Sequence, residues 1–139
     1  MSNHISNPNI GIPTAVKIFT WILICAGTFF FYAYTFSPNI SFPNANLETY
    51  SAKMGFASTG VRILGSVLAL VISVVYNKPN WLFITLISRV FIELGDVVVG
   101  LTLDGVTANT FALLVLAAAE IWAVLQLWKV IKTDPARSA

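Results

Sequence analysis

Three ionisable side chains lie close together inside the long apolar stretch 81–103. Arg89 precedes Glu93 by four residues, and Asp96 follows Glu93 after three, so a helix would carry all three on one face. This spacing lets Arg89 pair with Glu93 and brings Asp96 beside that pair. Because charged groups are costly against lipid, we expect this stripe to face protein or a water-filled cavity.

Two interpretations of the stripe are open. The charges could form a structural ion pair that only locks the helices together, as buried ionic networks often do. They could instead form a site for proton transfer or for binding a polar group, since ionisable residues inside a membrane usually mark a functional site.

Two more ionisable residues are expected at the same depth, on other helices. At 1.5 Å per residue, Arg62 lies about 16 Å from Ser51, taken as the membrane boundary, and Glu120 lies about 18 Å from the start of its own helix. Arg62 is therefore predicted to point at Glu93 or Glu120, either as a counter-ion or as a group that holds an anion or oxyanion. A ladder of small residues on the Arg62 helix predicts close helix packing; it comprises Gly65, Ala69 and Ser73.

The expected buried charges do not balance. Arg62 and Arg89 bring two positive charges against three negative charges from the acids Glu93, Asp96 and Glu120. A carboxylate left unpaired in an apolar site usually takes up a proton, so at least one acid is expected to be protonated and able to donate. The alternative is a cationic ligand that supplies the missing charge.

The amino-acid composition indicates the class of protein in which these charged groups are placed. The chain has 139 residues, of which 57% are hydrophobic and 10% charged, whereas soluble domains are about 25% charged. The sequence therefore predicts an integral membrane protein. A net charge of +2 with scattered cations does not indicate a nucleic-acid surface.

The apolar runs predict an all-α fold, a four-helix transmembrane bundle in one domain. The helices are expected at roughly 15–36, 54–76, 81–103 and 108–131, with a polar tail at 1–14, a loop at 37–52, the membrane domain at 15–132 and a short tail at 133–139. The first run is longer than a signal-peptide core and lacks a cleavage pattern, so we interpret it as a retained helix.

One face of the first helix can form hydrogen bonds through its side chains. It carries Trp21, Thr28 and Tyr32, together with Cys25 and Thr35. We expect this face to turn inward, with Trp21, Thr28 and Tyr32 contributing to binding.

The sequence contains no motif that is typical of a metal or cofactor site. Cys25 is the only cysteine and His4 the only histidine, and no phosphate-binding glycine loop occurs. We therefore predict no metal and no cofactor. The chemistry left to carboxylates, arginines and hydroxyls is proton transfer, such as isomerisation, cyclisation or epoxide opening of a lipophilic molecule.

Cations are unevenly distributed between the helix ends. One side is expected to carry Lys17, Lys78, Lys129, Lys132 and Arg137, and the other Lys53 alone. The positive-inside rule then predicts that both termini are cytoplasmic.

The chain also resembles a known group. Its size, its predicted spans, the Gly60-Val-Arg62 segment and the Arg89…Asp96…Asp104-Gly105 pattern are similar to the DoxX-like group of small four-helix membrane proteins and neighbouring domains of unknown function. The resemblance implies a four-helix architecture more than an activity. Some members of the wider group are linked to quinone-coupled oxidoreductase complexes.

The leading hypothesis is a site that binds or transforms a small lipophilic molecule. Glu93, Asp96 and Glu120 are the candidate acids and bases, and Arg62 and Arg89 the candidate anion-holding groups. An accessory subunit of a larger membrane complex and a proton-coupled carrier are the alternatives, so whether the chain is an enzyme stays open. Its expected partners are the bilayer, the lipophilic molecule, and either a second copy or a membrane complex.

Overall fold

The computed structural model describes residues 11–41, 49–103 and 105–133. Within these ranges the chain forms helices and turns and no strand, so the predicted all-α class is confirmed. The long helices are α1 (Thr14–Phe36), α3 (Tyr50–Val75), α4 (Pro79–Leu103) and α5 (Ala108–Thr133), and a single helical turn, α2 (Pro38–Ser41), follows α1.

Three of these helices, α1, α3 and α5, are long and apolar enough to cross a membrane. α4 matches them in length, at 25 residues. It differs from them in carrying three charged residues near its middle, Arg89, Glu93 and Asp96. By composition, the described helices therefore support three crossings directly.

The region between the first two long helices differs from the predicted loop at 37–52. α2 occupies part of it, and α3 starts at Tyr50, four residues before the predicted start. The Thr49 hydroxyl accepts a hydrogen bond from the Ala52 N–H at 3.3 Å. Such a cap satisfies a free amide of the first turn and stabilises the earlier start.

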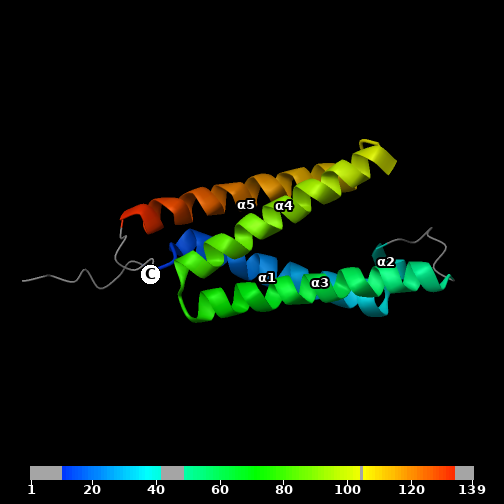
Figure 1. Cartoon of the computed structure of the whole chain (residues 1–139), viewed down its shortest axis with the longest axis horizontal. Coiled ribbons are helices and arrows are strands. Elements are labelled where there is room, and N and C mark those ends of the chain that lie inside the picture. The colour runs from blue at the N-terminus through cyan, green and yellow to red at the C-terminus, as the bar shows by residue number, and fades with distance from the viewer. Residues whose placement is uncertain (1–10, 42–48, 104, 134–139) are drawn as a thin grey trace, which may run out of the picture.

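The long helices form two antiparallel pairs, α1 with α3 and α4 with α5 (Figure 1). The pairs converge at the α3–α4 turn and diverge toward the opposite end (Figure 1). At the convergent end, the Ile12 N–H donates to Asn77 Oδ1 at 3.1 Å, which ties the start of α1 to the α3–α4 turn. Asn77 has φ +51°, a left-handed conformation that asparagine tolerates better than most residues.

The buried apolar core fills the convergent half. It takes side chains from all four long helices and from Ile12, which precedes α1. The helical members are Val16, Leu23, Ile24, Val67, Leu70, Val74, Leu82, Leu86, Ala123 and Leu127. Most of these residues lie in the first half of α1 and α4 or the second half of α3 and α5. Close packing therefore holds one half of the molecule together, and the other half can enclose a pocket.

The convergent end also carries most of the lysines. Lys17, Lys78, Lys129 and Lys132 lie at or near helix ends on this side, and Lys53 lies at the opposite end. The predicted grouping of cations is confirmed for these residues, while Arg137 lies outside the described ranges. Which side of the membrane this end faces stays a prediction.

Candidate functional site

Arg89 lies on α4 at the boundary between the packed and the open halves. Its Nε donates to Glu120 Oε1 at 2.7 Å, and one terminal nitrogen contacts Glu93 Oε1 at 3.1 Å. The other terminal nitrogen donates to Ser66 Oγ at 2.9 Å. One guanidinium therefore connects α3, α4 and α5.

Glu120 is the most deeply buried of the charged residues, with a side chain that is 0% exposed. Its Oε1 accepts from Arg89, while Oε2 has no hydrogen-bond partner among the described residues. A buried carboxylate is stable only when a paired cation offsets the loss of its hydration. Arg89 supplies that cation, so this contact fixes α4 against α5.

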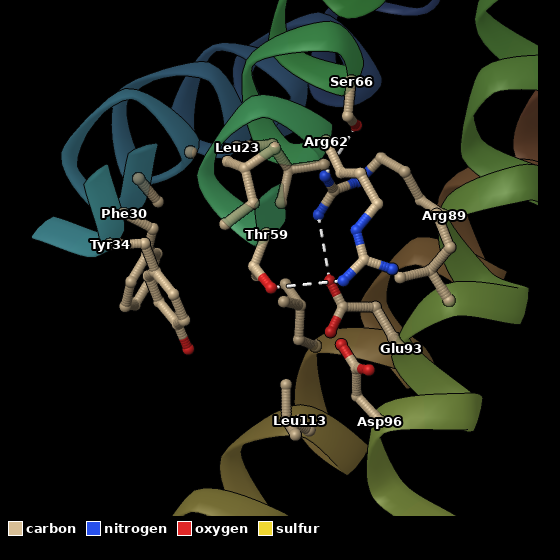
Figure 2. A pocket seen from close by; sticks show the side chains of 15 residues that line it. Leu23, Phe30, Tyr34, Thr59, Arg62, Ser66, Arg89, Glu93, Asp96 and Leu113 are labelled. Carbon is tan, nitrogen blue, oxygen red and sulfur yellow. Dashed lines mark hydrogen bonds and ion pairs between the residues drawn. The ribbon is translucent and has the colours of Figure 1, made fainter. Parts of the chain in front are cut away.

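A pocket of about 390 Å³ lies between the two helix pairs, next to the Arg89 contacts (Figure 2). All four long helices line it. The apolar wall consists of Leu23, Ala26, Gly27, Phe30, Ile63, Ile92, Leu113 and Leu116, and the polar wall of Tyr34, Thr59, Arg62, Ser66, Arg89, Glu93 and Asp96. Ligand sites typically enclose about 300–1,000 Å³ and combine apolar walls with a few convergent polar groups. This pocket has both properties.

Arg62 lines the pocket from α3 without an acidic partner. Its terminal nitrogen donates to Thr59 Oγ1 at 3.2 Å, and no ion pair joins it to a carboxylate in the described part of the chain. Arg62 therefore forms no ion pair with Glu93 or Glu120, although Arg62 and Glu93 line the same pocket. Arg89 binds both acids instead, since it shares α4 with Glu93 and packs against α5.

Asp96 lines the same wall, one turn beyond Glu93. Figure 2 shows the two carboxyl groups close together, with Arg62 above them. They lie near enough to interact electrostatically. Asp96 forms no hydrogen bond or ion pair within the described ranges. Its carboxyl group is therefore available to whatever occupies the pocket.

The predicted inward orientation is wrong for Trp21, Thr28 and Tyr32, whereas Thr35 on the same face packs against α3. Trp21, Thr28 and Tyr32 are exposed, at 47% for Trp21 and 54% for Tyr32, and none of them lines the pocket. The Thr28 hydroxyl donates to the Ile24 carbonyl within its own helix at 2.8 Å. A helical hydroxyl can satisfy itself in this way, so it need not point toward a neighbouring helix.

α1 instead presents Phe30 and Tyr34 to the pocket. Tyr34 lies near enough to Asp96 and Glu93 to interact with their charges across the pocket. Tyr34 was not predicted as a site residue, because it is one of two tyrosines in the aromatic stretch 29–36, which gives no periodic signal. Ser66, the α3 partner of Arg89, was likewise not predicted as a site residue.

The structure thus brings together most of the predicted acids and bases. Arg89, Glu93 and Glu120 make direct contacts, and Arg62 and Asp96 share the pocket wall with Glu93. Among the described residues, no group of three or more His, Cys, Asp or Glu side chains is arranged to hold a metal ion.

Comparison with known proteins identifies no related protein. No family model matches the chain, and no curated protein or solved structure matches it. The resemblance to the DoxX-like group therefore stays a prediction.

Proposed function

We propose that this chain is an integral membrane protein with four crossings, whose pocket binds a small lipophilic molecule and transforms it by acid/base chemistry. The single observation that carries the proposal is the 390 Å³ pocket. It has apolar walls on all four long helices and two ionic side chains that form no ion pair with any described residue.

The proposed crossing by α4 rests on how its charges are covered. The side chains of Arg89 and Glu93 are only 13% and 12% exposed, and Arg89 is neutralised by Glu93 and by Glu120 of α5. A charge that is paired within protein avoids most of the cost of facing lipid. Exposed side chains elsewhere on α4 are largely apolar, such as Phe91, Ile92 and Val98.

The pocket favours ligand binding over a purely structural role. In an accessory subunit whose charges only fix helix packing, we would expect a dry and fully paired ion network. Arg89 and its acids fit that description, but Arg62 and Asp96 do not, since both line an open space. The apolar walls suit a lipophilic molecule, and the polar wall suits a single polar group on that molecule.

Acid/base chemistry is the reaction type that these side chains can support. Carboxyl groups at positions 93 and 96 can exchange protons, and a guanidinium can hold negative charge that develops on an oxygen. Because the site holds three acids against two arginines, we propose that one acid carries the proton in the empty pocket.

Occupancy of the pocket can be measured on the purified full-length protein in detergent. Native mass spectrometry should detect a co-purifying small molecule in the wild type. Ala26→Phe places a ring in the pocket and should abolish the bound mass. Ala112→Phe is the matched control, because Ala112 is an exposed alanine on α5 that does not line the pocket.

The bound mass should persist in the Ala112→Phe control. If Ala26→Phe retained the same bound mass, the pocket would not be the binding site. If only protein partners co-purified and Ala26→Phe behaved like the wild type, the accessory-subunit function would replace the present proposal.

A further inference from the structure

We propose that Arg62 and Asp96 act together on a carbonyl group of the bound molecule. Asp96 removes a proton from the carbon beside the carbonyl, and Arg62 holds the enolate oxygen that results. The inference rests on the proposed function, because it needs a lipophilic molecule in the pocket. It names the substrate class as a lipophilic ketone or enone and the reaction as an isomerisation.

The contacts of the three acids single out Asp96 as the base. Glu120 is fully buried and does not line the pocket, so a substrate cannot reach it. Glu93 lines the pocket, but its Oε1 is bound to Arg89. Asp96 also lines the pocket and has neither a hydrogen bond nor an ion pair in the described ranges. It is therefore the acid whose oxygens are available for proton transfer.

The two arginines also differ in how many of their N–H donors already bind protein groups. Arg89 uses Nε and both terminal nitrogens on Glu120, Glu93 and Ser66. Among the described residues, Arg62 is bound only through one terminal nitrogen, to the Thr59 hydroxyl. A guanidinium has five N–H donors and stays protonated, so Arg62 has donors available for a substrate oxygen. Fixed donors in an apolar site are the usual means of stabilising an oxyanion.

All four long helices contribute side chains to the pocket that Asp96 lines. α4 itself supplies Glu93 and Arg89, α3 supplies Arg62, and α1 supplies the Tyr34 phenol. α5 adds only apolar side chains to the pocket, Leu113 and Leu116. The arrangement has a base on one helix, an oxyanion holder on the facing helix and an apolar wall for the substrate skeleton.

The proton balance closes without any other reactant. In the first step the C–H bond beside the carbonyl breaks, and its proton forms an O–H bond with the Asp96 carboxylate. The electron pair forms a carbon–carbon double bond, and the negative charge passes to the oxygen held by Arg62. In the second step Asp96 returns the proton to a different carbon of the conjugated system. The product is an isomer of the substrate.

A lipophilic phenolate resembles the enolate, so 2-naphthol is a suitable binding probe. Its fluorescence should report binding to the purified full-length protein in detergent. Measured above the pKa of 2-naphthol, where the probe is the naphtholate, Asp96→Asn should tighten binding by about tenfold, because it removes a negative charge facing the probe. Arg62→Met should weaken binding by a similar factor. Lys53→Met, a cation of α3 that does not line the pocket, should leave the affinity unchanged.

2-Methylnaphthalene separates failure of this inference from failure of the proposed function. It has no oxygen and tests only whether the pocket accepts a lipophilic ring. If it binds while naphthol affinity is insensitive to Asp96→Asn and Arg62→Met, the assignment of an enolate site is wrong. The proposal that the pocket binds a lipophilic molecule would then be retained. If neither probe binds, both proposals fall.

Deuterium exchange tests the chemical step directly. In D₂O, the wild-type protein should catalyse incorporation of deuterium beside the carbonyl of 2-tetralone above the buffer rate, as measured by mass spectrometry. Asp96→Asn should abolish the catalysed exchange, and Arg62→Met should slow it by about 100-fold, the usual effect of losing an oxyanion donor. Lys53→Met should exchange at the wild-type rate. Exchange no faster than buffer with the wild type, or equal rates in all variants, would overturn the inference.

Discussion

Arg89 and Glu120 form a 2.7 Å ion pair although they lie 31 residues apart in the sequence. The Glu120 side chain is fully buried and the Arg89 side chain nearly so. Because Arg89 also binds Glu93 and Ser66, this pair is the centre of a network that joins three helices. Stability should therefore depend far more on Arg89 than on Arg62.

Arg89→Met should destabilise the protein strongly. The substitution leaves Glu120 buried without a cation and removes the partner of Glu93, a loss of roughly 3 to 5 kcal/mol. Thermal unfolding in detergent, followed by circular dichroism, would measure this loss.

Arg62→Met is the matched control for this measurement. Arg62 is exposed and has no ion pair in the described ranges, so its loss should cost less than about 1 kcal/mol. Equal destabilisation by the two variants would argue against the contacts described for Arg89.

Neutralising the three acids should have graded effects. Glu120→Gln removes the closest charged partner of Arg89 and should cost about 1–3 kcal/mol, with Glu93 remaining as a partner. Glu93→Gln should cost less, because Glu93 is more exposed than Glu120. Asp96→Asn should change stability by less than about 0.5 kcal/mol, as is usual for a side chain that makes no specific contact. An Asp96→Asn variant less stable than Glu120→Gln would reverse the assigned roles.

Gly60 should tolerate no side chain, because α1 passes close to it. An added Cβ would overlap Thr35 Oγ1 and lie 3.4 Å from the carbonyl oxygen of Phe31. Gly60→Ala should therefore cost about 1–3 kcal/mol, the usual range for overpacking. Unfolding of the single and double variants in detergent would measure the loss.

Adding Thr35→Ala to this variant should recover part of the stability, since it removes the overlapping oxygen. Thr35 Oγ1 has no hydrogen-bond partner among the described residues, so its own loss should be small. Gly65→Ala is the control, because nothing lies within 4 Å of an added Cβ there. A Gly60→Ala variant as stable as Gly65→Ala would contradict the close approach of α1 and α3.

The predicted topology can be tested by cysteine labelling in intact cells. In a Cys25→Ser background, a cysteine at position 2 should resist a membrane-impermeant maleimide, and one at position 44 should react. The physical reason is the lysine-rich end of the molecule, which should stay in the cytoplasm. Labelling at position 2 from outside would invert the assignment.

The sequence by itself determined the helices and the depth of the charges. Long apolar runs form helices because their backbone groups must pair internally in lipid, and this depends only on local composition. The helix at 108–131, for example, was placed to within two residues of α5. The common depth of Arg89, Glu93 and Glu120 followed from the constant rise of a helix.

The rotation of each helix about its axis was decided only by tertiary packing. On α1, side-chain hydroxyls favoured the face of Thr28 and Tyr32, but Thr28 satisfies itself within the helix and Tyr34 faces the pocket instead. On α3, the predicted small-residue ladder included Gly65, where no atom lies within 4 Å of an added Cβ, whereas α1 packs closely against Gly60.

The choice of Arg89 over Arg62 as the partner of the acids also depended on tertiary structure. Both arginines have the same charge and a similar depth, so no local property separates them. The difference arises because α4 packs along α5, which brings Arg89 to Glu120, while the two helix pairs diverge and leave Arg62 beside the pocket. Helix propensity and hydropathy carry no information about that divergence, because it depends on contacts between residues far apart in the sequence.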